Sequence, residues 1–278
     1  MKIEQLRKWS AAHRRNAVFL RPDEEQTAGV TRIGGKPLLP ADFTFPAYTD
    51  AEDGKTRPLA FLAQVDLTEI HPFDTEGLLP DTGILSFFYE LDVQPWGYDT
   101  AHAGSARVYW FPDSSALTET ALPDALDIAF VLPPLALVPG QFSDLPDYGE
   151  AQAHCGLPAD DEETWDACQA LRTEDFSDDV RIKLLGYADE IQDDMTEQCA
   201  LIAHGYSVGD GYPELPDAVQ AEITADAADW VLLFQLDSVD TDDFELMFGD
   251  CGRIYFFIRK EDLAARRFDR IWLILQCC

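Results

Sequence analysis

The feature that most constrains the fold is a sequence pattern that occurs twice. An apolar segment ends in Gln-x-Asp, and Asp-x-Gly follows, with Phe-Phe beginning four residues after the glycine. The first copy consists of Gln64, Asp66, Asp81, Gly83, Phe87 and Phe88, and the second of Gln235, Asp237, Asp250, Gly252, Phe256 and Phe257. Apolar runs that end in turn residues are typical of buried strands joined by tight turns. The repeat therefore predicts two similar β units that pack about a pseudo-twofold axis around one core.

The remaining patterns place other elements around these units. Strands are predicted over 17–22, 58–67, 83–91, 105–112, 230–238, 243–249, 253–258 and 271–277, and helices over 2–15, 160–172, 215–230 and 261–268. Asp217 is a candidate N-cap of the third helix. Residues 31–46 are rich in Gly and Pro and predict an ordered loop. Proline interrupts the apolar segment 128–140, which predicts two short edge strands or one bent strand.

Together these elements predict a β-rich α+β fold. Its antiparallel or mixed β units are duplicated internally, and its helices are peripheral. We expect a single domain over residues 1–278, with repeat units at about 58–112 and 230–277 and an acidic helical insertion at about 142–228. Hydrophobic residues make up 46% of the chain, which is enough to form a packed core despite the charge.

Charge is distributed very unevenly along the chain. The chain carries 52 acidic and 20 basic residues, a formal net charge of −32, and residues 113–250 alone hold 33 acidic and 3 basic ones. Nucleic acid is disfavoured as a partner because its phosphates would be repelled. Charge runs are most often solvated surface, but this one also suits a basic protein partner. The sequence predicts no oligomeric state.

Targeting signals are not evident. No apolar run approaches the roughly 20 residues that span a membrane, and the basic N-terminal segment lacks the apolar core of a secretory signal. We therefore expect a cytoplasmic protein without membrane contact. The six cysteines include no Cys-x-x-Cys pair, so reduced thiols are expected.

The polar ends of the repeated strands are the candidate functional residues. Gln64, Asp66, Gln235 and Asp237 leave apolar strands near the expected axis, and Gln192 and Asp250 are candidates to join them. One interpretation places all six in a shared cleft that binds a small polar ligand or a peptide. The other is structural, because buried glutamines satisfy backbone groups and aspartates cap turns.

Motifs for metals and nucleotides fail on spacing. The five histidines and six cysteines form no zinc-type pattern, and Asp240, Asp242 and Asp243 lack the glycine of a calcium loop. The Gly34-Gly35-Lys36 sequence is followed by proline, so it predicts a turn and not a phosphate-binding loop. We predict no metal and no cofactor.

Several motifs, taken together, resemble the YwqG-like family, which is catalogued as domain of unknown function 1963. They are RIGGKPLLP at 32–40, PLAFLAQVDL at 58–67, LPDTGILSFFY at 79–89, ARVYW at 106–110, LLGYADEIQDDM at 184–195, LLFQLDS at 232–238, FGDCGRIYFFI at 248–258 and the C-terminal DRIWLILQC. The resemblance extends from about residue 17 to 277. It implies a β-rich α+β fold of bacterial origin and implies no activity, because the family has none established.

Two functions follow as hypotheses. The first is a non-enzymatic binding module whose acidic surface engages a basic protein partner, and it is favoured because no catalytic grouping is evident. The second is an enzyme or a receptor for a small polar ligand, with its site between the two repeats.

Overall fold

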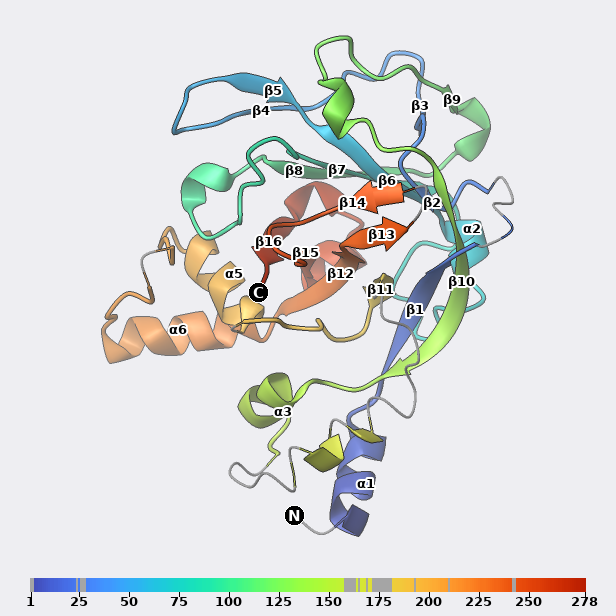
Figure 1. Cartoon of the computed structure of the whole chain (residues 1–278). Helices are drawn as coiled ribbons and strands as arrows, with labels where there is room; N and C mark the ends of the chain where they lie inside the picture. The colour runs from blue at the N-terminus through green and yellow to red at the C-terminus, as the bar shows by residue number, and fades with distance from the viewer. Residues whose placement is uncertain are drawn as a thin grey trace.

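The computed structural model describes residues 3–23, 25, 29–157, 164, 166–168, 170–171, 182–192, 194–209, 211–241 and 244–278. A ten-stranded antiparallel sheet curls into a nearly closed barrel, with several short helices outside it (Figure 1). Its strands, in chain order, are β1 (Arg15–Pro22), β2 (Arg32–Ile33), β6 (Ala60–Asp66), β7 (Ile84–Tyr89), β8 (Ala106–Phe111), β10 (Leu135–Asp144), β11 (Lys183–Leu185), β12 (Trp230–Asp237), β15 (Arg253–Arg259) and β16 (Trp272–Gln276). The prediction of a β-rich α+β fold is therefore confirmed.

Smaller elements decorate this sheet. Three two-stranded ribbons are β3 (Leu38–Leu39) with β9 (Thr118–Glu119), β4 (Ala47–Thr49) with β5 (Thr56–Pro58), and β13 (Val239–Thr241) with β14 (Phe244–Leu246). The α-helices are α1 (Ile3–Ala12), α2 (Leu67–Ile70), α3 (Tyr148–His154), α5 (Met195–Ala203), α6 (Asp217–Ala227) and α7 (Lys260–Ala264). Single 3₁₀ turns lie at Thr100–His102, Ser114–Ala116, Ile128–Phe130 and Phe268–Arg270.

The pairing of β1 with β10 lies at the middle of the sheet. The strand order is β16-β15-β12-β11-β1-β10-β2-β6-β7-β8, so four strands lie on either side of this central pair. Arg15 pairs with Asp144 and Pro22 with Leu137, which makes it the longest ladder of the sheet. The N-terminal strand therefore joins segments that lie far along the chain.

Both Gln-x-Asp strands carry a register shift just before the glutamine. The ladder of β6 with β7 skips Leu62, and the ladder of β12 with β15 skips Leu233. A bulge places two consecutive residues against the same side of the sheet. Leu62 and Ala63 therefore share the main core, as do Leu233 and Phe234, and the remaining residues are apolar on both faces because the outside of the sheet is also covered.

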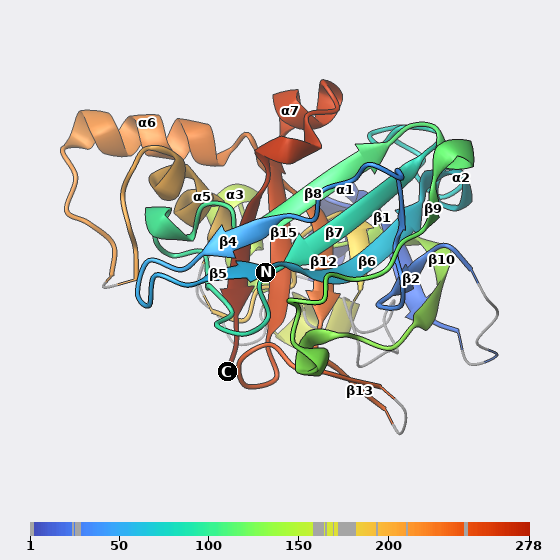
Figure 2. The same ribbon diagram turned by 90° about the horizontal axis from the view of Figure 1, so that it is seen from above.

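The barrel interior is the main core, and separate layers cover its outside. Inside the barrel, the Phe87 ring lies 4.4 Å from the Phe234 ring and 5.2 Å from the Phe256 ring, which joins strands from the two sides. Outside, α5 and α6 cover β12, β15 and β16. Aromatic side chains from residues 43–48 pack on the outside of β6–β8, where the view from above shows the β4–β5 ribbon beside these strands (Figure 2).

Three predicted local details are corrected. The segment 31–46, predicted as a loop, contains β2 and β3, because Gly34 and Gly35 turn the chain between two short pairings. Segment 128–140 was predicted as two short edge strands or one bent strand; it contributes one strand, β10, which is central, so the alternative with two edge strands is wrong. Beyond Ala136, however, β10 has β1 as its neighbour in the described ladders, and Pro139 is tolerated there. Asp217 begins α6 but does not cap it, since Pro216 is the N-cap.

Other predicted elements form close to their expected positions. The helix predicted at 2–15 is α1, and the strands of both repeat units form within two or three residues of their predicted ends. The helix predicted over 160–172 lies largely outside the described residues.

Candidate functional site

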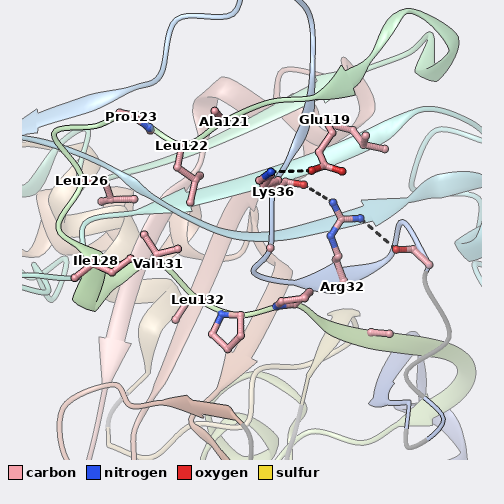
Figure 3. Close-up of a pocket in the computed structure, with 16 residues that line it drawn as sticks. Arg32, Lys36, Glu119, Ala121, Leu122, Pro123, Leu126, Ile128, Val131 and Leu132 are labelled. Carbon is pink, nitrogen blue, oxygen red and sulfur yellow. Dashed lines mark hydrogen bonds and ion pairs between the residues drawn. The ribbon is translucent and has the colours of Figure 1, made fainter.

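A large groove lies between β2, β9 and the segment of residues 121–134 that arches across the sheet (Figure 3). Its volume is about 900 Å³. We call it the arch groove. It is lined by Gly29, Arg32, Gly35, Lys36, Leu38, Glu119, Ala121, Leu122, Pro123, Leu126, Ile128, Val131, Leu132, Pro133, Pro134 and Ala136.

Two glycines hold the turn that forms one wall of the arch groove. Gly34 and Gly35 have φ values of +61° and +73°, which L side chains rarely adopt. A Cβ on Gly34 would lie 2.2 Å from the Pro133 carbonyl oxygen, and the Gly35 N–H donates to the Leu132 carbonyl at 2.9 Å. The predicted turn thus brings β2 into direct contact with the arch.

One end of the arch groove is charged. The Arg32 guanidinium donates to the backbone carbonyls of Gly29, Val30 and Lys36. Burial lowers the pKa of Arg32, but an arginine pKa is normally so high that the side chain stays charged at neutral pH. Lys36 Nζ lies 3.3 Å from Glu119 Oε1, and both side chains are more than 60% exposed. These three side chains leave one positive charge in excess at this end.

The other side of the arch groove is apolar. Leu122, Leu126 and Val131 line it from the arch, and Ile128 is 82% exposed at its mouth (Figure 3). Leu132 also lines it but packs into the barrel core. Among the residues that the structure describes, the lining contains no Ser, Thr, Cys, His or Tyr. The apolar part of the lining therefore suits a bound apolar surface, and the Lys36 amine and the Glu119 carboxylate at its charged end pair with each other.

Gln64, a predicted site residue, supports the arch groove from behind. Its side chain is fully buried, and its amide accepts from the Leu38 N–H at 2.9 Å and donates to the Leu38 carbonyl at 2.8 Å. It also donates to Ser86 Oγ at 2.9 Å. Gln64 thereby replaces a missing strand neighbour and positions Leu38, which lines the groove.

Gln235, in β12, is likewise a buried glutamine whose amide hydrogen-bonds to a distant segment of the chain. Its fully buried amide accepts from the Asp189 N–H at 2.9 Å and donates to the Asp189 carboxylate at 2.8 Å. Asp237 forms an ion pair with Arg253 at 3.0 Å. Four strands separate β12 from β6 in the sheet order, so the two Gln-x-Asp motifs lie on strands that are not neighbours in the sheet.

The other three predicted residues occupy turns. Asp66 caps α2 by accepting from the Thr68 N–H, and Gln192 is exposed and accepts from the Tyr98 hydroxyl. Asp250 is exposed, and its carbonyl accepts from the Cys278 N–H. None of the six predicted residues is part of the arch-groove lining. The contacts favour the structural interpretation, and a ligand-binding role for these six stays a prediction.

A buried charge cluster was not found from the sequence. The Lys183 ammonium is fully buried and lies 2.8 Å from Asp144 Oδ2 and 2.9 Å from Asp189 Oδ2. The Tyr187 N–H also donates to Asp144. A usable signal was present, because Lys183 is the single lysine between residues 56 and 259 and lies in an apolar strand sequence.

An acidic cluster lies beside α3 and α5. Oxygen atoms of Glu150, Glu190 and Asp194 lie within 4.8 Å of one another. Burial, followed by the nearby Asp147, Asp194 and Glu150 carboxylates, raises the pKa of Glu190 to about 9. Glu190 is therefore protonated at neutral pH in the folded chain, which relieves the repulsion between these neighbouring carboxylates.

The fold and the groove define a class: a barrel-like α+β protein with an apolar surface groove that is charged at one end. Residues 31–277 match the family described as Domain of unknown function (DUF1963). The chain belongs to this family, as its motifs indicated. No curated protein matches the chain. Strand β1 lies outside the matched range although it is central in the sheet. None of the helices in the described ranges has the length and hydropathy needed to cross a bilayer.

Proposed function

We propose that the protein is a non-enzymatic binding protein and that the arch groove holds a largely apolar ligand. The observation that carries this proposal is the groove itself. Its volume of about 900 Å³ is in the range of sites for small organic molecules, and most of its lining residues are apolar. Among the described residues, the lining offers two cations and one carboxylate, and the Lys36 amine is paired with that carboxylate, which supports binding over catalysis.

Binding of the neutral, polarity-sensitive dye Nile red tests this proposal. We expect its fluorescence to rise on addition of the full chain and the rise to weaken at least several-fold in Ile128→Asp, because that side chain lines the groove and is exposed. The matched control is Val138→Asp, a half-exposed apolar residue outside the groove lining. Equal dye binding by both variants would reject the groove as the site.

A basic protein partner is the second candidate, and the charge distribution favours it. Exposed acidic residues without intervening basic ones follow one another along α6 and its flanks: Glu214, Asp217, Glu222 and Asp229. Such a surface would attract a cationic protein and speed its association at low salt.

Capture from lysate at low salt, followed by a salt step, tests this second candidate. We expect a basic protein to elute at raised salt and to be lost when these four carboxylates are replaced by amides. Capture that is insensitive to both changes would argue against an electrostatic partner.

An enzyme or a receptor for a small polar ligand between the two repeats is the weaker proposal. Its candidate residues Gln64 and Gln235 are buried and bonded to backbone groups, and Asp237 is paired with Arg253. Those side chains would have to give up these contacts in order to reach a ligand.

We also infer that the single domain contains an internal duplication about an axis between β1 and β10. Three similarities support it: the mirrored strand order, the bulges before Gln64 and Gln235, and the paired positive φ values. Those φ values are +61° and +73° at Gly34 and Gly35 after β2, and +61° and +76° at Leu185, which ends β11, and at Gly186. An experimental structure tests the inference, which requires strands β2, β6, β7 and β8 to superpose in order on β11, β12, β15 and β16.

A further inference from the structure

We propose that the ligand of the arch groove is an amphipathic carboxylate, a molecule with an apolar chain and a single anionic head, and that Arg32 and Lys36 bind the head. This inference rests on the proposed function, since it names the ligand class of the same groove. The juxtaposition that carries it is a pair of cations, accompanied by the single carboxylate Glu119 among the described residues, at one end of a lining whose other part is apolar.

The position of these cations is unusual for this chain. Basic residues are outnumbered 52 to 20, yet in the described part of the chain the groove lining includes two of them and a single acidic residue. A cationic or zwitterionic head would meet this excess positive charge, whereas an anionic head is complementary to it.

The positive charge of Arg32 is available to a ligand, because its described hydrogen bonds do not neutralise it. Each of its hydrogen bonds in the described residues goes to a backbone carbonyl, which carries no net charge, and the nearby Glu119 carboxylate already pairs with Lys36. The carbonyls fix the orientation of the guanidinium, and its planar donors suit a carboxylate. The exposed Lys36–Glu119 pair is weak, so Lys36 can exchange Glu119 for a ligand at little cost.

The apolar side chains then accept the tail. From the charged end, the lining continues through Leu122 and Leu126 to Ile128 and Val131 on the arch (Figure 3). An alkyl chain laid along them removes apolar surface from water on both partners. Head and tail are thus recognised by different parts of one groove.

Calorimetric titration of the full chain with three C10 probes tests the inference. The probes are decanoate, 1-decanol and decyltrimethylammonium, used below their aggregation concentrations in 0.15 M salt, where the overall negative charge is screened beyond about 8 Å. We expect decanoate to bind about tenfold more tightly than decanol and the ammonium probe to bind most weakly.

Matched variants separate the head from the tail. Lys36→Met and Lys55→Met remove the same charge from exposed lysines that each pair with one carboxylate, but only the first lines the groove. We expect Lys36→Met to weaken decanoate binding several-fold without changing decanol binding, and Lys55→Met to change neither. Arg32→Lys keeps the charge and removes the planar donors, so it should weaken decanoate alone.

Each failure has its own signature. Equal affinity for decanoate and decanol, or equal effects of Lys36→Met and Lys55→Met, would overturn the carboxylate inference and leave apolar binding in the groove standing. Absence of binding by all three probes, together with no Nile red signal, would overturn the proposed function itself.

Discussion

Lys183 is the residue whose charge the interior depends on most. Its fully buried ammonium contacts two carboxylates, Asp144 and Asp189. Removing one partner from a buried ion network leaves uncompensated charge and costs about 3–5 kcal/mol. We expect Lys183→Met to lose that much in the free energy of unfolding, measured with urea, whereas the exposed Lys55→Met changes it by less than about 0.5 kcal/mol. A loss below about 1 kcal/mol for Lys183→Met would show that the carboxylates are protonated without it.

Glu190 makes stability depend on pH in the opposite sense to an ordinary salt-bridged carboxylate. Its pKa is about 9 in the folded chain, against about 4.3 in an unfolded one, so the folded state holds a proton that the unfolded state releases. Stability therefore falls as pH rises through this window. We expect Glu190→Gln to raise Tm by several degrees at pH 8 and by little at pH 4. The exposed Glu222→Gln should change Tm equally at both.

The glutamines show how far residue-level prediction reaches. The sequence identified Gln64 and Gln235 as special because each ends an apolar strand. It could not show which backbone group each one binds, since Leu38 and Asp189 lie 26 and 46 residues away. Arg32 and Lys36 were overlooked as a pair, because the groove depends on an arch almost a hundred residues further along the chain.

Among the elements, the turn after β2 determines whether the arch groove forms. An alanine at position 34 would need a φ of +61° and would place its Cβ 2.2 Å from the Pro133 oxygen. We expect Gly34→Ala to cost about 2–3 kcal/mol in unfolding free energy and to weaken Nile red binding. Gly54→Ala is the control, because Gly54 has a φ of +68° with no atom within 4 Å of its Cβ, so it isolates backbone strain. Equal losses for the two variants would contradict a specific contact with the arch.

Secondary structure was predicted correctly where hydrophobic runs were long. The prediction failed where a strand is defined by the neighbouring strands with which it pairs. Strands β6, β7, β12 and β15 follow directly from their apolar sequences. The two-residue strand β2 did not, because it is defined only by its ladders to β6 and β10. Segment 128–140 was predicted from its prolines as two short edge strands or one bent strand, and in the described residues the ladder of β10 with β2 ends at Ala136, which explains why Pro139 is tolerated in a central strand.

For the whole molecule, the sheet extends beyond the part that the family match covers. The matched range starts at residue 31, whereas β1 pairs with both β10 and β11. We expect a chain restricted to residues 31–277 to expose two unpaired edges and to aggregate or unfold. Circular dichroism and size-exclusion chromatography of this chain beside the full one measure the effect. Cooperative unfolding of the shortened chain at an unchanged Tm would contradict it.

The position of β1 also sets an order of events during synthesis. Leu20 pairs with Pro139 and Val18 with Leu184, so β1 leaves the ribosome long before either of its neighbours exists. The strands from β2 to β8 can form their local ladders while β1 is still unpaired. The central pairings of β1 with β10 and β11 cannot form until those two strands have been made. The apolar strand β1 must therefore remain unpaired without aggregating until residue 185 has emerged. The charged residues Arg14, Arg15 and Arg21, in and beside that strand, disfavour aggregation during this time.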